Sequence, residues 1–142
     1  MDITKKVEEV KDKKHKLLLV VGGPGSGKSK VIRDYSTETG IPIINLDKIF
    51  ANTPNNQLVQ EMKNFLSTYH QDVLLLDNKR VIYAKDSEID LLSFLKDISE
   101  DIVVISTWNG KIEDGQLYHI RSQAPSDLIY SVDKEDFDYI LC

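Results

Sequence analysis

Cysteine is nearly absent from this sequence, and its scarcity limits the classes of protein to which the chain can belong. Cys142 is the single cysteine, so no internal disulfide can form, and a reducing cytoplasm is the expected location. The sequence also lacks an apolar run of about 18 residues, so we expect no membrane-spanning helix. The lysine-rich start has no apolar core of the kind found in signal peptides. These absences predict a cytoplasmic protein that does not associate with a membrane.

Positive charge is scarce outside the first part of the chain. Residues 1–16 carry six lysines and four acidic residues, whereas the remainder carries 12 basic and 19 acidic residues. A broad basic face for nucleic acid is therefore not expected. The early lysines could contact a phosphate backbone or simply form the solvated face of a helix, so direct DNA binding stays open. The three histidines are too scattered to suggest a metal site.

A glycine-rich stretch, Gly22 to Ser29 (GGPGSGKS), matches the phosphate-binding loop pattern G-x-x-x-x-G-K-[ST] without a mismatch. The apolar run at 17–21 predicts a buried strand before the loop. Apolar residues at helical spacing follow it, and Gly40 is expected to end that helix. A glycine loop between a strand and a helix is the context that the motif requires, whereas a chance glycine-rich turn would lack it.

The residue types of the loop suit a nucleotide and its magnesium ion. Glycines let successive backbone N–H groups point at phosphate oxygens, and the following helix adds the positive end of its dipole. Lys28 is expected to contact the β- and γ-phosphates as a catalytic charge, and Ser29 to ligate Mg²⁺. We therefore predict ATP and Mg²⁺ as cofactors. The predicted nucleotide-binding residues are Gly23, Pro24, Gly25, Ser26, Gly27, Lys28 and Ser29.

Strands and helices alternate along the chain, so residues 1–142 are expected to form one α/β domain. The predicted architecture is a three-layer sandwich whose mainly parallel sheet has five strands, at 17–21, 41–46, 73–76, 102–106 and 127–132. Helices are expected at 2–13, after the loop, after Thr53-Pro54, and behind a capping box at Ser87 and Asp90. Ligands in such sheets bind at the carboxyl ends of the strands, so the loop, Asp77 and residues 107–109 should share one rim.

Asp77 ends the third predicted strand, which is the pattern of a Walker B strand. Its carboxylate would hold Mg²⁺ through water, although an aspartate that caps a turn would give the same pattern. Asn78 follows as a third catalytic candidate besides Lys28 and Asp77. An amide can hold a water molecule but cannot take its proton.

Four segments resemble those of known families: GGPGSGKS, INLDKIF at 44–50, LLLDN at 74–78 and VVISTWNG at 103–110. In their order the chain is similar to the core of AAA-type P-loop ATPases. More specifically, it resembles the BrxF family, small P-loop proteins of type 3 BREX phage-defence systems. The resemblance implies nucleotide binding, a role in bacterial antiviral defence, and work alongside other BREX proteins. Many AAA-type ATPases carry a glutamate where this chain has Asn78, and the chain offers no room for a helical lid after the fifth predicted strand.

Other residues leave alternatives open. Thr107 and Asn109 could sense the γ-phosphate, or could belong to an ordinary Asn-Gly turn. Trp108 fits either packing or a partner surface. Arg121 could serve a neighbouring copy as an arginine finger in a homo-oligomer, or could be an ordinary surface residue. Asp47 follows the second strand, where small kinases often activate their acceptor, or it caps the turn.

Three functions follow from these observations. The first is a nucleotide-binding subunit whose ATP hydrolysis is slow or depends on a partner. The second is a small-molecule or polynucleotide kinase, for which the predicted lid region offers only Arg121. The third is a scaffold that the nucleotide merely stabilises.

Overall fold

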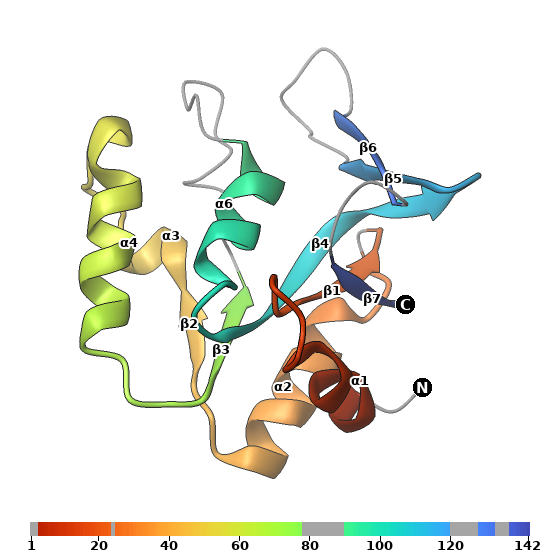
Figure 1. Cartoon of the computed structure of the whole chain (residues 1–142), viewed down its shortest axis with the longest axis horizontal. Helices are drawn as coiled ribbons and strands as arrows, with labels where there is room; N and C mark the ends of the chain where they lie inside the picture. The colour runs from red at the N-terminus through yellow and green to blue at the C-terminus, as the bar shows by residue number, and fades with distance from the viewer. Residues whose placement is uncertain (1–2, 24, 78–89, 120–127, 133–136) are drawn as a thin grey trace.

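The computed structural model describes residues 3–23, 25–77, 90–119, 128–132 and 137–142, whose arrangement is shown in Figure 1. Five strands form a parallel sheet, with every neighbouring pair in parallel register. From one edge to the other they are β2 (Ile43–Asn45), β3 (Val73–Asp77), β4 (Val103–Glu113), β1 (Leu17–Gly22) and β7 (Asp138–Leu141). All six residues of β1, which lies between β4 and β7, are buried, because helices cover both faces of the sheet.

Within the described residues the sheet has seven strands rather than the predicted five, because β4 runs on beyond its parallel neighbours. There it pairs antiparallel with β5 (Gln116–His119), and β5 pairs with β6 (Leu128–Ser131). Figure 1 shows these strands as an arm that projects from the main sheet. The segment 127–132, predicted as the fifth core strand, is therefore in this arm. Its apolar residues suggested a buried core strand, but Ile129 is 55% exposed.

The fifth parallel strand is instead β7, in a tail that the sequence indicated only as acidic. Phe137 and Ile140 are buried there, and this burial holds the strand beside β1. The shortness of the strand and its neighbouring acidic residues hid this pattern.

The helices lie on both faces of the sheet and give the predicted three layers. On one face, α1 (Ile3–Val10) and α2 (Lys28–Thr39) pack against β-strand residues such as Leu18 and Leu75. On the other face lie α3 (Leu46–Ile49), α4 (Leu58–Ser67) and α6 (Leu91–Ile98), around residues such as Leu19 and Trp108. No helix in the described ranges is both long enough and apolar enough to cross a bilayer.

Local signals account for some of the helix ends. Gly40 ends α2 with a left-handed φ of 75°, and its N–H donates to the carbonyl oxygen of Ser36. Asp90 is itself the N-cap of α6, rather than the fourth residue of the predicted capping box, because its carboxylate accepts a hydrogen bond from the Ser93 N–H. The helix expected after Thr53-Pro54 begins only at Leu58, since a 3-10 turn (η1, Asn55–Gln57) comes first. The short helix α3 was not predicted. Pro24, Asn78, Ser87 and Arg121 lie outside the described residues.

Candidate nucleotide site

The phosphate loop has the backbone that its glycines were expected to allow. Gly25 and Gly27 have φ values of 75° and 96°, in the left-handed region that other residues avoid. The Ser26 N–H donates to the Gly23 carbonyl oxygen and closes the turn. A Cβ added at Gly23, Gly25 or Gly27 would meet no atom within 4 Å, so the space beside the loop is open to a ligand.

The helix that follows the loop offers unneutralised backbone dipoles to that space. Gly27 is the N-cap of α2 and makes no side-chain capping hydrogen bond, and the first turn holds no acidic residue. The free N–H groups at the start of this 12-residue helix therefore keep their affinity for an anion. The Lys28 ammonium folds back across the loop and donates to the Gly23 carbonyl oxygen at 2.8 Å. Both features fit the phosphate groups that the sequence predicts.

Asp77 is the point at which three elements meet. Its Oδ2 atom accepts a hydrogen bond of 3.0 Å from the Ser29 hydroxyl on α2. Its Oδ1 atom accepts one of 3.0 Å from the Thr107 hydroxyl on β4. Strand alternation explains the meeting, because Val73, Leu75 and Asp77 face the same side of the sheet as α2. The predicted pair of Mg²⁺ ligands, Ser29 and Asp77, is thus brought together at the carboxyl end of β3.

Residues 107–109 share this rim, as predicted, but they do not form a turn. They continue β4, with Thr107 opposite Val20 and Asn109 opposite Gly22 in the register with β1. Thr107 is only 4% exposed and contacts Asp77 directly. The reason that no turn forms is that β5 supplies a pairing partner for residues 110–113, so the Asn-Gly pair is extended.

Trp108 is a packing residue. Its side chain is fully buried, and its indole N–H donates to the Tyr118 carbonyl oxygen at 2.9 Å. The ring packs against His119 and Tyr130, with centroids 4.8 and 5.9 Å away. The next residue but one, Gly110, allows this close approach, because an added Cβ there would lie 1.8 Å from the same Tyr118 oxygen.

Sequence reasoning missed the support that the end of β7 gives to the loop. The Cys142 N–H donates to the Val21 carbonyl oxygen at 2.8 Å, next to the first loop glycine. A Cβ added at Gly22 would lie 2.2 Å from the Ser26 hydroxyl oxygen and 3.2 Å from the Cys142 Cβ. The apolar residues Phe137 and Ile140 were the sequence signal from which β7 could have been predicted. The thiol itself is exposed and unpaired with another cysteine.

A cation at this rim would need ligands beyond the protein. The described part of the chain holds no cluster of three or more His, Cys, Asp or Glu side chains of the kind that binds a metal alone. Mg²⁺ commonly takes one or two protein oxygens and completes its shell with water and phosphate. The oxygens of Ser29 and Asp77 fit this pattern. Pro24 and Asn78, the other site candidates, lie outside the described residues.

Comparison with known proteins indicates the family of the chain. A family model described as an AAA domain matches residues 6–109, a span that includes the phosphate loop, Asp77 and Thr107. No significant match was found among curated proteins or among solved structures. The matched span covers most of the chain, and it contains the P-loop core found in the fold. The chain belongs to the AAA domain family.

Proposed function

We propose that this chain binds ATP with Mg²⁺ and serves as a subunit of a bacterial BREX phage-defence system, with slow ATP hydrolysis when alone. One observation carries the nucleotide part of the proposal: the Asp77 carboxylate joins the Ser29 and Thr107 hydroxyls beside the uncapped start of α2. A serine hydroxyl and a carboxylate next to an anion-binding helix end are the groups that a magnesium nucleotide requires.

Each group has a defined task in this proposal. The backbone N–H groups of residues 25–29 bind the phosphates, and the Lys28 ammonium exchanges the Gly23 carbonyl for a phosphate oxygen. Ser29 and Asp77 hold Mg²⁺, which neutralises phosphate charge when bound. Thr107 is a positioning residue, because its hydrogen bond fixes one oxygen of Asp77 and leaves the other directed at Ser29.

We expect slow hydrolysis because the residue that follows the Walker B aspartate is not a base. The residue after Asp77 is Asn78, whose amide cannot accept a proton from the attacking water. An arginine supplied by a neighbouring subunit typically contributes about 10³–10⁵ to the rate of phosphoryl transfer. A subunit assembly would supply what the single chain lacks, so the proposal expects activity to depend on partners.

The BREX assignment is supported by where the resembling segments lie. INLDKIF spans the end of β2 and α3, LLLD forms the end of β3, and VVISTWNG lies in β4. Three neighbouring strands therefore carry the motifs toward one rim of the sheet. A partner that senses the bound nucleotide would contact this rim.

Phosphate release measured on the isolated protein, alone and mixed with the proteins encoded beside it, tests this proposal. We expect turnover below about 1 s⁻¹, the low end of ordinary enzymes, when the protein is alone. We expect a rise when the partner proteins are added. Faster turnover by the dilute single chain would refute partner dependence. The BREX role would be refuted if the neighbouring gene products neither bind this protein nor stimulate its ATP hydrolysis.

A kinase is the second candidate, because Asp47 lies in the first turn of α3, two residues after Asn45. Asn45 is the register partner of Asp77, so Asp47 follows the strand end next to the magnesium ligand. Incubation with γ-labelled ATP and nucleoside, sugar or polynucleotide acceptors separates the two functions. Labelled product would favour the kinase, and labelled free phosphate alone would favour the ATPase. Binding with neither product would leave the nucleotide as a stabilising ligand of a scaffold.

A further inference from the structure

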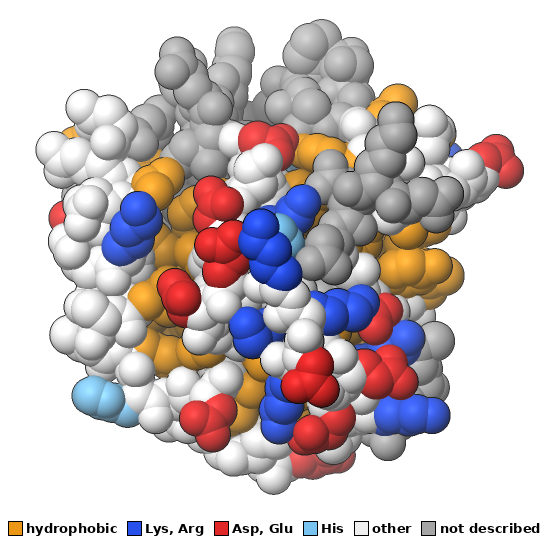
Figure 2. Space-filling model, viewed as in Figure 1, with side chains coloured by type: hydrophobic (Ala, Val, Ile, Leu, Met, Phe, Trp, Pro, Cys, Tyr) orange, Lys and Arg blue, Asp and Glu red, His pale blue; other side chains and the backbone are white. Residues whose placement is uncertain are grey.

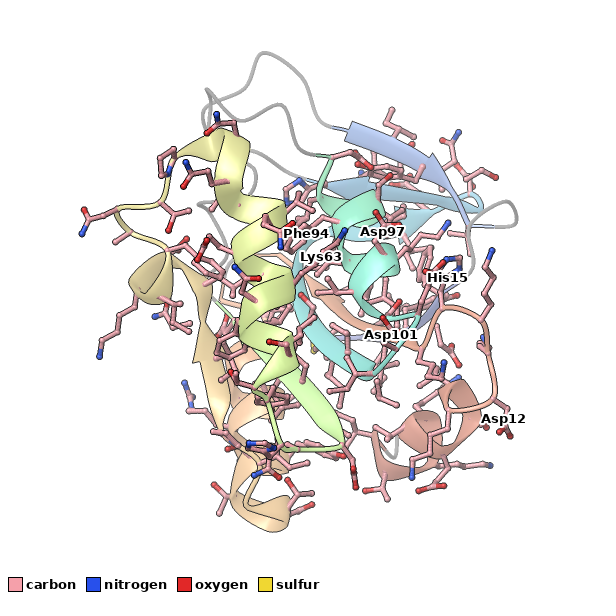
Figure 3. The ribbon with its side chains drawn as sticks, turned by 60° about the vertical axis from the view of Figure 1, so that its left-hand side comes forward. Asp12, His15, Lys63, Phe94, Asp97 and Asp101 are labelled. Carbon is pink, nitrogen blue, oxygen red and sulfur yellow. The ribbon has the colours of Figure 1, made fainter. Side chains whose placement is uncertain are left out.

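A groove of about 520 Å³ lies between α4 and α6, on the face of the sheet opposite α2. Figure 2 shows orange hydrophobic side chains between these helices, with red carboxylates gathered toward α6. Figure 3 turns this face forward and shows Lys63 of α4 near Phe94 of α6. The groove belongs to the α4 and α6 surface and does not include the phosphate loop, Asp77 or Thr107.

The apolar part of the groove comes from one face of each helix. On α4, Val59 and Leu66 stand seven residues apart, two helical turns along one side. On α6, Phe94 and Ile98 stand four residues apart in the opposite wall, where both are largely buried, so Val59 and the half-buried Leu66 provide most of the accessible apolar surface. Val59 is 45% exposed, whereas most large hydrophobic residues in the described ranges are at least partly buried. A hydrophobic partner side chain could therefore remove apolar surface from water here.

The rim of the groove is strongly acidic. Asp90, Asp97, Glu100 and Asp101 line it together with Lys63, and the Lys16 ammonium lies beside it, where it donates to the Glu100 carbonyl oxygen at 2.9 Å. Two of these carboxylates are already engaged, since Glu100 pairs with His15 at 3.3 Å and Asp90 accepts from Tyr130. Within the described ranges, the exposed carboxylates of Asp97 and Asp101 make no ion pair, so their charge is directed to the solvent beside the apolar wall.

We propose that this groove binds an amphipathic helix of a partner protein, one that presents apolar anchors flanked by lysine or arginine. A helix laid between two helices places its anchors every three or four residues, which matches the spacing of the groove walls. The acidic rim supplies the charge complementarity and excludes two other occupants. Nucleic acid and anionic membranes both carry negative charge and would be repelled. The site does not depend on the bound nucleotide.

Two synthetic peptides of about 12 residues, or about 18 Å as helices, provide the probe. Both carry leucines at positions 1, 4, 8 and 11 of the peptide, and they differ only in having lysine or glutamate elsewhere. Fluorescence anisotropy measures their binding to the full chain. We expect the lysine peptide to bind, the glutamate peptide not to bind, and the affinity to fall as salt rises.

Three variants locate the contact. Asp97→Lys together with Asp101→Lys should weaken binding of the lysine peptide by about tenfold or more, through loss and reversal of rim charge. Val59→Ser should weaken it through loss of an anchor contact. Asp34→Lys, a matched charge reversal at an exposed residue of α2, should leave it unchanged. ATP affinity should be the same in all of these variants, which also shows that they are folded.

Several outcomes would overturn the proposal. These are failure of the lysine peptide to bind, equal binding of both peptides, or unchanged binding by the doubly reversed variant. Sedimentation provides a further test, because a wild-type dimer that the double reversal dissociates would identify a second copy of this chain as the occupant instead.

Discussion

The hydroxyl of Ser29 donates a hydrogen bond of 3.0 Å to the carboxylate of Asp77, a residue 48 positions away in the sequence. This bond joins the first turn of α2 to the end of β3 and places two oxygens side by side at the carboxyl rim of the sheet. In the proposed function, these two residues would hold Mg²⁺ when the nucleotide is bound.

Replacing Asp77 with alanine should therefore reduce the benefit that Mg²⁺ gives to ATP binding. The ratio of ATP affinities with Mg²⁺ and with a chelator should fall toward one, while the phosphate loop continues to bind weakly. Calorimetry measures the two affinities, and thermal melting checks the fold. If the variant is unfolded, Asp77 is structural and its assignment as a magnesium ligand fails.

Replacing Thr107 with valine should show whether this residue orients the carboxylate. Valine keeps the shape but removes the hydroxyl that donates to Asp77, and a hydrogen bond to a charged group contributes about 1.5–3 kcal/mol. We expect weaker magnesium-dependent ATP binding together with a lower unfolding free energy. Thr107→Ser should restore both, since it keeps the donor. Identical magnesium dependence in wild type and Thr107→Val would count against a positioning role.

Replacing Gly110 with alanine should disturb the arm formed by β4, β5 and β6. The new Cβ would collide with the Tyr118 backbone oxygen, and overpacking of this kind costs about 1–3 kcal/mol. Trp108 is the only tryptophan and packs at this point, so its fluorescence reports the change. We expect a red-shifted emission and a lower unfolding midpoint. An unchanged emission spectrum would show that the arm tolerates the side chain.

Acid should weaken the contact between the arm and α6. Partial burial raises the pKa of the Asp90 carboxyl, but hydrogen bonds from Tyr130 and Ser93 outweigh this and hold the pKa below its ordinary value. Because its pKa is lowered in the folded protein, the ionised Asp90 carboxylate stabilises the fold at pH values above the ordinary pKa. This contribution to stability is lost as the pH falls through the folded pKa. Tyr130→Phe should raise the Asp90 pKa in an NMR titration and make stability less dependent on pH below about 4. An unmoved titration would contradict the role of the Tyr130 hydroxyl.

The sequence was informative where a residue's role follows from its local pattern. The glycines at 25 and 27 predicted the loop backbone, and the apolar run before them predicted a fully buried strand. The meeting of Ser29 and Asp77 was also predictable, because the carboxyl ends of parallel strands share one edge.

The sequence was less informative where pairing over long distances decides the structure. The run at 128–131 and the tail at 138–141 both carry apolar residues, and only their partners distinguish an arm strand from a core strand. The same holds for Asn109 and Gly110, which would suit a turn but are held extended by β5. The direct contact of Thr107 with Asp77 needed the register of β3 with β4, which no local pattern contains.

Calorimetric titration of ATP with Mg²⁺ into wild type, Lys28→Ala and Lys30→Ala tests the central claim most directly. Both variants remove one lysine charge from the start of α2, but Lys28 reaches across the phosphate loop whereas Lys30 is exposed and pairs with Asp34. The account predicts binding by wild type, unchanged affinity for Lys30→Ala, and a loss of about tenfold or more for Lys28→Ala, as expected for a charge-assisted contact worth at least about 1.4 kcal/mol. Equal affinity of wild type and Lys28→Ala, or no binding by wild type, would contradict it.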